Sequence, residues 1–153
     1  MKKLKIGLLG MGRIGRLHGD NVTYFIKNAE IVAAGDPMLN DSMKEWAADL
    51  GIQKVFDDPM KVVQDPEVEA VLICTSTAAH AELSIAAAKA GKHIFCEKPV
   101  HTDLNEIRKI LAEVEKAGVK FQVGFVRRFD HNHKAVRDTV ASGKLGAPSV
   151  VKV

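Results

Sequence analysis

The chain contains 153 residues, of which 46% are hydrophobic, 27% charged and 5% aromatic, and its formal net charge at neutral pH is +3. This length can bury the core of about one domain. The basic residues are scattered rather than gathered into a stripe, which argues against a nucleic-acid partner. No apolar run approaches the ~18 residues of a membrane span.

The N-terminal segment MKKLKIGLLGMG has two lysines before an apolar stretch, as secretion signals do. Its apolar part is short and is interrupted by glycines and then by Arg13, so we expect a first strand instead. The two cysteines, Cys74 and Cys96, each close an apolar run and lack C-x-x-C spacing. We therefore expect buried, reduced thiols and a cytoplasmic location.

Six short apolar runs predict strands, at residues 4–10, 30–36, 54–56, 70–75, 93–97 and 121–126. Most are continuously apolar, as is typical of parallel strands covered on both faces. Amphipathic stretches between them predict helices at residues 13–28, 41–50, 78–90, 103–117 and 130–142. This alternation predicts an α/β fold of the Rossmann type, a doubly wound parallel sheet with helices on both faces.

The ends and the apolar faces of these helices are also predicted. Gly51, Gly91 and Gly118 are expected to end three of them, and Thr102 or Asp103 to cap the helix at 103–117. The first helix should bury one broad face, formed by Ile14, Leu17, Val22, Phe25 and Ile26. The helix at 103–117 should bury a stripe of Leu104, Ile107, Ile110, Leu111 and Val114.

A glycine-rich loop follows the first strand and opens the first helix. Its G-x-G-x-x-G pattern consists of Gly10, Met11, Gly12, Arg13, Ile14 and Gly15. The first glycine permits a tight turn, the second lets the backbone approach a pyrophosphate, and the third lets the helix pack close to the strand. The helix N-terminus would bind the phosphates. The alternatives are glycines that only make a turn, or a methyltransferase, which usually lacks the third glycine.

An acidic residue, Asp36, ends the second predicted strand, about 20 residues after the glycine loop, as in dinucleotide-binding domains. We expect its carboxylate to accept hydrogen bonds from the adenosine ribose of NAD. A carboxylate there repels a 2′-phosphate, and the next residues, Pro37 and Met38, offer no arginine to bind one. NAD is therefore predicted over NADP.

Three further segments follow in order, CTSTAAH (74–80), CEKPV (96–100) and VGFVRRFD (123–130). With them, essentially the whole chain resembles the Gfo/Idh/MocA oxidoreductases, particularly the inositol 2-dehydrogenase branch. The resemblance implies an NAD-dependent dehydrogenase that oxidises a secondary alcohol of a small polyol or sugar. It also implies that Lys98 is the catalytic residue that hydrogen-bonds to the reacting hydroxyl, and that Glu97 contacts the ribose of the cofactor.

The position of Lys98 agrees with this implied role. Ligands of open α/β sheets collect at the carboxyl ends of the strands, where the fifth strand ends here. A lysine partly desolvated against a neutral nicotinamide can hold its proton loosely enough to relay it. Pro99 would fix the backbone, for which a cis Lys98–Pro99 bond is one way. The alternative is an exposed ion pair of Glu97 and Lys98 before a turn proline.

The resemblance places three more groups at the cofactor. Thr75, Ser76 and Thr77 follow the fourth strand, although the proline that many relatives have in this loop is absent. His80 opens the next helix, either as a cofactor contact or as a capping or packing histidine. Arg127 is expected to face cofactor or substrate, and the alternative is a solvent-exposed arginine.

No metal site is predicted. His131 and His133, within DHNH (130–133), would point about 200° apart on a helix and cannot share a metal without other ligands. The remaining histidines, His18, His93 and His101, are isolated in the sequence, and we assign them no function.

The expected domain organisation is a dinucleotide-binding domain at 1–146 and, at 147–153, the truncated start of a second domain for substrate binding and oligomerisation. The family's D-x-x-x-H, whose histidine is the implied acid/base, does not occur in the sequence. We therefore expect NAD binding with little or no turnover, and a homo-oligomer formed through the strand-like SVVKV. The alternative is a free-standing NAD(P)-binding or redox-sensing module.

Overall fold

The computed structural model describes residues 2–150, which contain a six-stranded parallel sheet. The strands are β1 (Leu4–Leu9), β2 (Ala29–Gly35), β3 (Lys54–Phe56), β4 (Ala70–Ile73), β5 (His93–Glu97) and β6 (Phe121–Gly124). Their order in the sheet is β3-β2-β1-β4-β5-β6, and all neighbouring pairs are parallel. This is the doubly wound Rossmann order, so the predicted fold class is confirmed.

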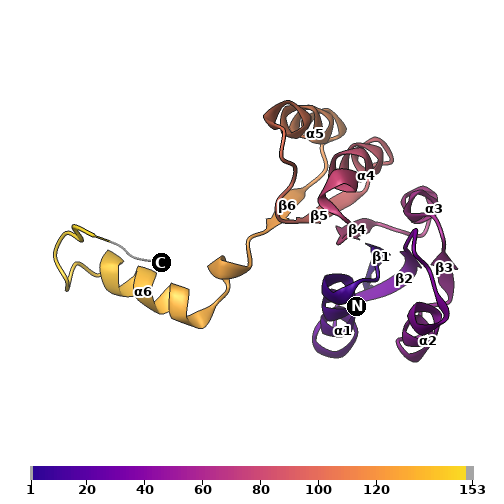
Figure 1. The fold of residues 1–153 in the computed structure, drawn as a ribbon, viewed down its shortest axis with the longest axis horizontal. Coiled ribbons are helices and arrows are strands. Elements are labelled where there is room, and N and C mark those ends of the chain that lie inside the picture. Colours follow the sequence, from indigo (N-terminus) through magenta and orange to yellow (C-terminus); the bar gives the residue numbers. More distant parts are fainter. Residues whose placement is uncertain (1, 151–153) are drawn as a thin grey trace.

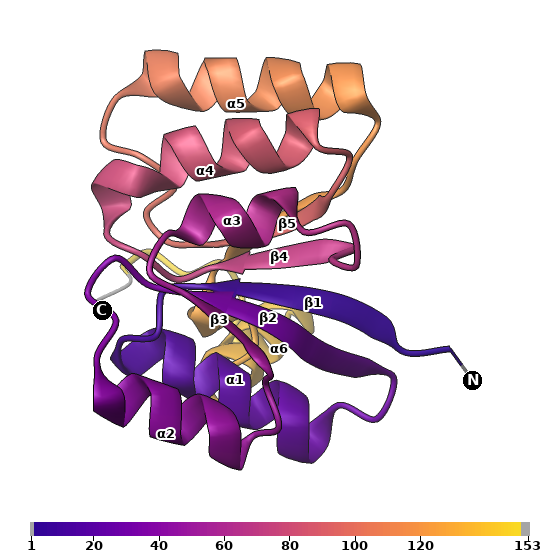
Figure 2. The same ribbon diagram turned by 90° about the vertical axis from the view of Figure 1, so that its right-hand side faces the viewer.

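Helices cover both faces of the sheet, with α1 (Arg13–Phe25) and α2 (Asp41–Asp49) on one face (Figure 2). The other face carries α3 (Pro59–Gln64), α4 (Thr77–Lys89) and α5 (Leu104–Ala117). After β6 come a 3-10 turn, η1 (Val126–Arg128), and α6 (His131–Ala141), which stands away from the sheet (Figure 1). The predicted elements are confirmed to within three residues at each end.

One helix, α3, is missing from the sequence prediction. The side chain of Asp58 accepts a hydrogen bond from the Met60 N–H at 2.8 Å and so caps this helix, and Pro59 occupies its first turn. An N-cap aspartate followed by proline is a common helix start, so the signal was present in the sequence.

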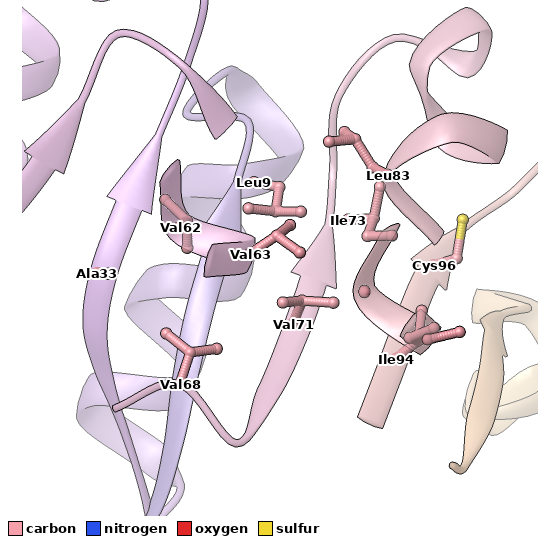
Figure 3. Close-up of a cluster of buried hydrophobic side chains, with 12 residues drawn as sticks. Leu9, Ala33, Val62, Val63, Val68, Val71, Ile73, Leu83, Ile94 and Cys96 are labelled. Carbon is pink, nitrogen blue, oxygen red and sulfur yellow. The ribbon is translucent and has the colours of Figure 1, made fainter. Parts of the chain in front are cut away.

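Two apolar cores lie on opposite faces of the sheet. The first packs between the sheet and α3, α4 and α5, and includes Leu9 and Ile94 (Figure 3). The second packs on the side of α1 and α2, and includes Leu8. Successive side chains of a strand point to opposite faces, so Phe95, next to Ile94, faces the α1 side, where its ring contacts that of His18. Buried faces on both sides explain why the strands are continuously apolar.

The predicted apolar face of α1 is wrong in part. Val22 is buried, but the other buried residues of α1 are glycines. At Gly19 the helix lies so close to α2 that a Cβ would be 2.6 Å from the Trp46 ring. A helix that approaches its neighbours through glycines turns its larger side chains outward. The exposed residues are Leu17, Phe25 and Ile26.

In α5 the predicted stripe is confirmed at Ile110 and Val114, which packs against the first core, and it is wrong at Leu104 and Leu111; Ile107 is half-buried. Ile110 is fully buried, whereas Leu104 and Leu111 are exposed. The helix is the outermost on its face and packs against α4 (Figure 2), so only a narrow line of its side chains reaches the core. Its ends are as expected: Asp103 accepts a hydrogen bond from the Asn105 N–H, and Gly118 adopts the left-handed conformation.

Within residues 2–150, no helix combines the length and apolarity needed to cross a membrane. In this same part of the chain, no three potential metal ligands lie close enough together to hold an ion. Of the predicted last strand, residues 149 and 150 are not in a strand, and 151–153 lie outside the described residues. Self-association through this segment stays a prediction.

Candidate functional site

Most of the predicted site residues gather at the carboxyl ends of the strands, where β1 and β4 are neighbours. The chain turns toward β2 after β1 and toward β5 after β4, so a crevice opens between them, as at the switch point of other open α/β sheets. Two clefts lie there, the first of about 810 Å³ and the second of about 570 Å³. They share a wall formed by Arg13, Ile14, Cys74 and Thr75. A long ligand can therefore lie along both clefts.

Two glycines of the loop are required by the fold itself. Gly10 has a φ of +95°, and a Cβ there would lie 2.7 Å from the backbone carbonyl of Cys74. A Cβ at Gly15 would lie 1.9 Å from the carbonyl oxygen of Gly10. The structure thus accounts for the tight turn and for the close packing of helix on strand.

Gly12 has no such internal reason to be glycine. Its φ of −70° and ψ of −171° suit any residue, and no heavy atom of a more distant residue lies within 4 Å of the position of its Cβ. Gly12 is also the N-cap of α1, and no side chain caps this helix end. The first N–H groups of α1 therefore lack partners beside the first cleft. A bare backbone with free N–H groups at a helix N-terminus fits a bound phosphate.

Asp36 holds the glycine loop against the end of β2. Its carboxylate is nearly buried, and it accepts hydrogen bonds from the N–H groups of Met11 at 2.6 Å and Met38 at 2.8 Å. Since a carboxylate has about four lone-pair sites, acceptor capacity remains toward the first cleft, which Asp36 lines. Among the described residues lining this cleft, Arg13 is the only basic one.

The first cleft also contains residues to which the sequence analysis gave no role. Asp58, Pro59 and Met60, at the start of α3, form part of its wall. The sequence analysis missed them together with α3. The pair Asp58-Pro59, a common helix start, is the sequence signal that would have predicted both.

Glu97 and Lys98 lie in the second cleft, at the end of β5. The Lys98–Pro99 peptide bond is cis. Oε2 of Glu97 accepts a hydrogen bond from the Lys98 N–H at 3.1 Å, and Oε1 lies 2.8 Å from Nε2 of His18. Within residues 2–150, no carboxylate pairs with the Lys98 ammonium, so the ion pair of Glu97 and Lys98 is not observed.

His18, which received no role in the sequence analysis, is therefore part of the site. It comes from the second turn of α1, and its ring packs edge-on against Phe95, with 5.3 Å between ring centroids. Its partner Glu97 is 79 residues away in the sequence. No local pattern could have predicted this contact.

His80 joins the two loops that line the second cleft. It is buried, with Nδ1 2.9 Å from the carbonyl oxygen of Pro99 and Nε2 3.1 Å from that of Thr75. Both ring nitrogens thus face backbone oxygens, which favours the packing alternative. A direct contact of His80 with the cofactor stays a prediction.

The loop after β4 follows the shared wall: Thr75 lines both clefts, Ser76 the first and Thr77 the second. Arg127 is not brought to either cleft. Its guanidinium lies 3.1 Å from Nε2 of His133, in a separate basic pocket beside α6. The described structure therefore favours the exposed-arginine alternative for Arg127, and its contact with cofactor or substrate stays a prediction.

Both cysteines are free, as expected; Cys96 is buried, whereas the prediction of a buried Cys74 is wrong, because this residue lines both clefts and is only half-buried. Burial raises the pKa of the Cys74 thiol to about 12 and that of the Cys96 thiol to about 11, and the nearby Glu97 carboxylate adds to both shifts. The thiols are therefore neutral at physiological pH, and Cys74 presents an uncharged surface to both clefts.

The sequence model described as "Oxidoreductase family, NAD-binding Rossmann fold", that of the Gfo/Idh/MocA proteins, matches residues 4–125. The chain belongs to this family. The Gfo/Idh/MocA match covers all six strands, the glycine loop and the E-K-P segment, and it ends before α6.

Among Gfo/Idh/MocA relatives, the chain is 41% identical over 150 residues to the myo-inositol 2-dehydrogenase of Thermotoga maritima. It is 37% identical over 150 residues to the scyllo-inositol 2-dehydrogenase (NAD(+)) of Bacillus subtilis. Each alignment covers 98% of this chain and 44% of the relative. The chain thus spans less than half the length of these proteins.

Solved structures show the same similarity. A probable dehydrogenase from Thermotoga maritima superposes with a TM-score of 0.87 at 43% identity. The scyllo-inositol dehydrogenase from Lactobacillus casei, solved with bound cofactor NAD(H) and scyllo-inositol, also gives 0.87, at 34% identity. Each comparison covers 95% of this chain and 43% of the other. The chain is thus an NAD-binding Rossmann domain of the Gfo/Idh/MocA family.

Proposed function

We propose that the chain binds NAD along the two joined clefts, with the adenosine half in the first and the nicotinamide half in the second. The main support is the distribution of the residues: Gly12 and Asp36 line the first cleft, Lys98 lines the second, and one wall joins them. The free N–H groups of α1 would bind the pyrophosphate near this wall. The free lone pairs of Asp36 would accept hydrogen bonds from the ribose hydroxyls.

The preference for NAD over NADP follows from the charge of the first cleft. The nearly buried carboxylate of Asp36 would repel a 2′-phosphate. Arg13, the one basic residue among the described lining residues, belongs to the wall shared with the second cleft rather than to the segment of Asp36, Pro37 and Met38. A 2′-phosphate would therefore find repulsion without a compensating cation.

We propose that the whole protein oxidises a secondary alcohol of a polyol or sugar, with inositols as the first candidates. The names of the relatives at 41% and 37% identity support this substrate class. Bound NAD supplies the hydride acceptor. The ammonium of Lys98 has no carboxylate partner among the described residues. It would hydrogen-bond to the reacting hydroxyl and relay the proton of this group. General acid–base catalysis of this kind accelerates reactions by about 10²–10⁴-fold. Glu97 would bond the nicotinamide-side ribose.

The chain alone is expected to turn over little substrate. No D-x-x-x-H occurs in its sequence, so the acid/base histidine that the family resemblance implies is not among its residues. Lys98 then lacks the partner that would accept the hydroxyl proton.

Calorimetric titrations of the purified chain with NADH and NADPH test the cofactor proposal. We expect a micromolar dissociation constant for NADH and a value at least about tenfold higher for NADPH. Absence of NADH binding would overturn the cofactor proposal, and equal affinities would overturn the preference. Rapid reduction of NAD by the chain with myo-inositol would show that no residue outside it is needed.

A further inference from the structure

We propose that His18 is a positioning residue: it fixes the carboxylate of Glu97 and thereby raises the affinity of the second cleft for the nicotinamide half of the cofactor. The inference rests on the proposed function, because it concerns the cleft in which that half would lie. It gives a role to a histidine of α1, a helix that also contributes Arg13, Ile14, Leu17 and Asn21 to the lining of this cleft.

The contact between the two side chains is close and partly shielded from water. Nε2 of His18 lies 2.8 Å from Oε1 of Glu97, and the side chains are only 24% and 18% exposed. A carboxylate can only accept hydrogen bonds, so Nε2 carries the proton and donates it. Hydrogen bonds to a charged acceptor are among the stronger ones, and they gain strength where water is largely excluded.

Glu97 is held at both oxygens by different elements. While His18 of α1 binds Oε1, the backbone N–H of Lys98 binds Oε2 at 3.1 Å. The backbone of β6 lies close against the Glu97 carboxylate, because a Cβ at Gly124 would lie only 3.0 Å from Oε1. Two donors and one tight wall restrict the carboxylate to one orientation. The side chain of Glu97 would therefore lose little conformational entropy when a ligand hydrogen-bonds to it.

The same arrangement leaves Lys98 available. Glu97 precedes Lys98 directly, yet its two oxygens bond His18 and a backbone N–H, and no carboxylate pairs with the Lys98 ammonium within the described residues. Without His18, Oε1 would lose its donor while remaining largely buried, and the Lys98 ammonium is a cation lining the same cleft. His18 therefore holds Glu97 in a position separate from the amine.

Two substitutions separate the hydrogen bond of His18 from the packing of its ring. His18→Phe keeps a ring of similar size against Phe95 and removes the donor. His18→Gln loses the ring but carries an amide N–H at about the reach of Nε2. The ligands are NADH and ADP, because ADP contains the part assigned to the first cleft and lacks the nicotinamide and its ribose.

For His18→Phe we expect the dissociation constant of NADH to rise about tenfold, the effect of one hydrogen bond to a charged group, and that of ADP to change less than about twofold. His18→Gln should bind NADH within about threefold of the wild type. In the ligand-free wild-type chain, nitrogen NMR should show a proton on Nε2 of His18.

The inference would be overturned by unchanged NADH affinity in His18→Phe, by equal weakening of NADH and ADP, or by an Nε2 without a proton. A His18→Gln variant as weak as His18→Phe would assign the effect to the ring and likewise contradict it. These failures differ from failure of the proposed function, in which the wild-type chain itself would not bind NADH.

Discussion

Oδ2 of Asp36 accepts a hydrogen bond from the N–H of Met11 at 2.6 Å, so the end of β2 holds the glycine loop directly. The other oxygen accepts from the N–H of Met38 at 2.8 Å. One side chain therefore sets the shape of the loop and also supplies one of the negative charges of the first cleft, which Asp58 and Glu82 line as well. Its substitution should change the stability of the chain and its cofactor preference together.

Asp36→Asn tests this double role. The amide removes the charge and can accept at only one end, so one backbone N–H loses its partner and the free energy of unfolding should fall by about 1–2 kcal/mol. The affinity for NADPH should rise relative to that for NADH, because the Asp36 charge no longer repels a 2′-phosphate. Urea denaturation and calorimetry measure the two effects. The control is Asp41→Asn, at the highly exposed start of α2. An unchanged ratio of the NADPH and NADH dissociation constants in Asp36→Asn would contradict the prediction.

Gly12→Ala should separate ligand binding from folding. Its backbone suits alanine and its Cβ would meet no atom of a more distant residue within 4 Å, so the melting temperature should stay close to that of the wild type. A methyl group there would block the approach of the pyrophosphate, so NADH affinity should fall at least about tenfold. Gly10→Ala is the comparison, since a positive φ and a clash with Cys74 should destabilise that variant strongly. Wild-type NADH affinity in Gly12→Ala would rule out close contact at this position.

His80→Phe should destabilise the chain. The substitution keeps a ring in the buried space but leaves the carbonyl oxygens of Pro99 and Thr75 without the imidazole, at a cost of about 2 kcal/mol. The midpoint of urea denaturation should fall while the slope stays the same. His131→Phe, at the exposed start of α6, serves as the matched control. Equal midpoints for the two variants would show that His80 does not hold the two loops together.

The cysteines should be unreactive in the folded chain. With pKa values raised to about 12 for Cys74 and about 11 for Cys96, little thiolate forms at pH 8. Alkylation by iodoacetamide, followed by mass spectrometry of the peptides, should therefore be slow at both residues and fast in urea. The unfolded chain ionises its thiols at lower pH, so the free energy of unfolding should decrease as pH rises from about 9 toward 11. Rapid alkylation of Cys74 in the folded chain at pH 8 would contradict the raised pKa.

Much of the first cleft is predictable from the sequence, because its determinants are local. The G-x-G-x-x-G pattern, its position between strand and helix, and an acidic residue at the end of the next strand together place Gly10 and Asp36 in one cleft. The E-K-P segment is equally local, and Lys98 lies at the strand end where the prediction put it.

The remaining features depend on packing between distant segments. The pair of His18 and Glu97 joins α1 to the end of β5 on the same face of the sheet, and nothing near His18 in the sequence indicates its partner. The buried face of α1 was mispredicted for a related reason: periodicity locates apolar stripes, whereas the close approach to Trp46 depends on Gly19, which carries no hydrophobic signal.

The position of α6 determines how its amide protons exchange with solvent. None of its eleven residues is buried, and it stands away from the sheet (Figure 1). An isolated helix of this length is marginally stable in water, and the Asp130 cap adds one hydrogen bond at its start. Its amide protons should therefore exchange with solvent through local opening, while those of the central strands exchange only when the whole sheet unfolds. Hydrogen exchange would thus divide the chain into two cooperative units of very different protection.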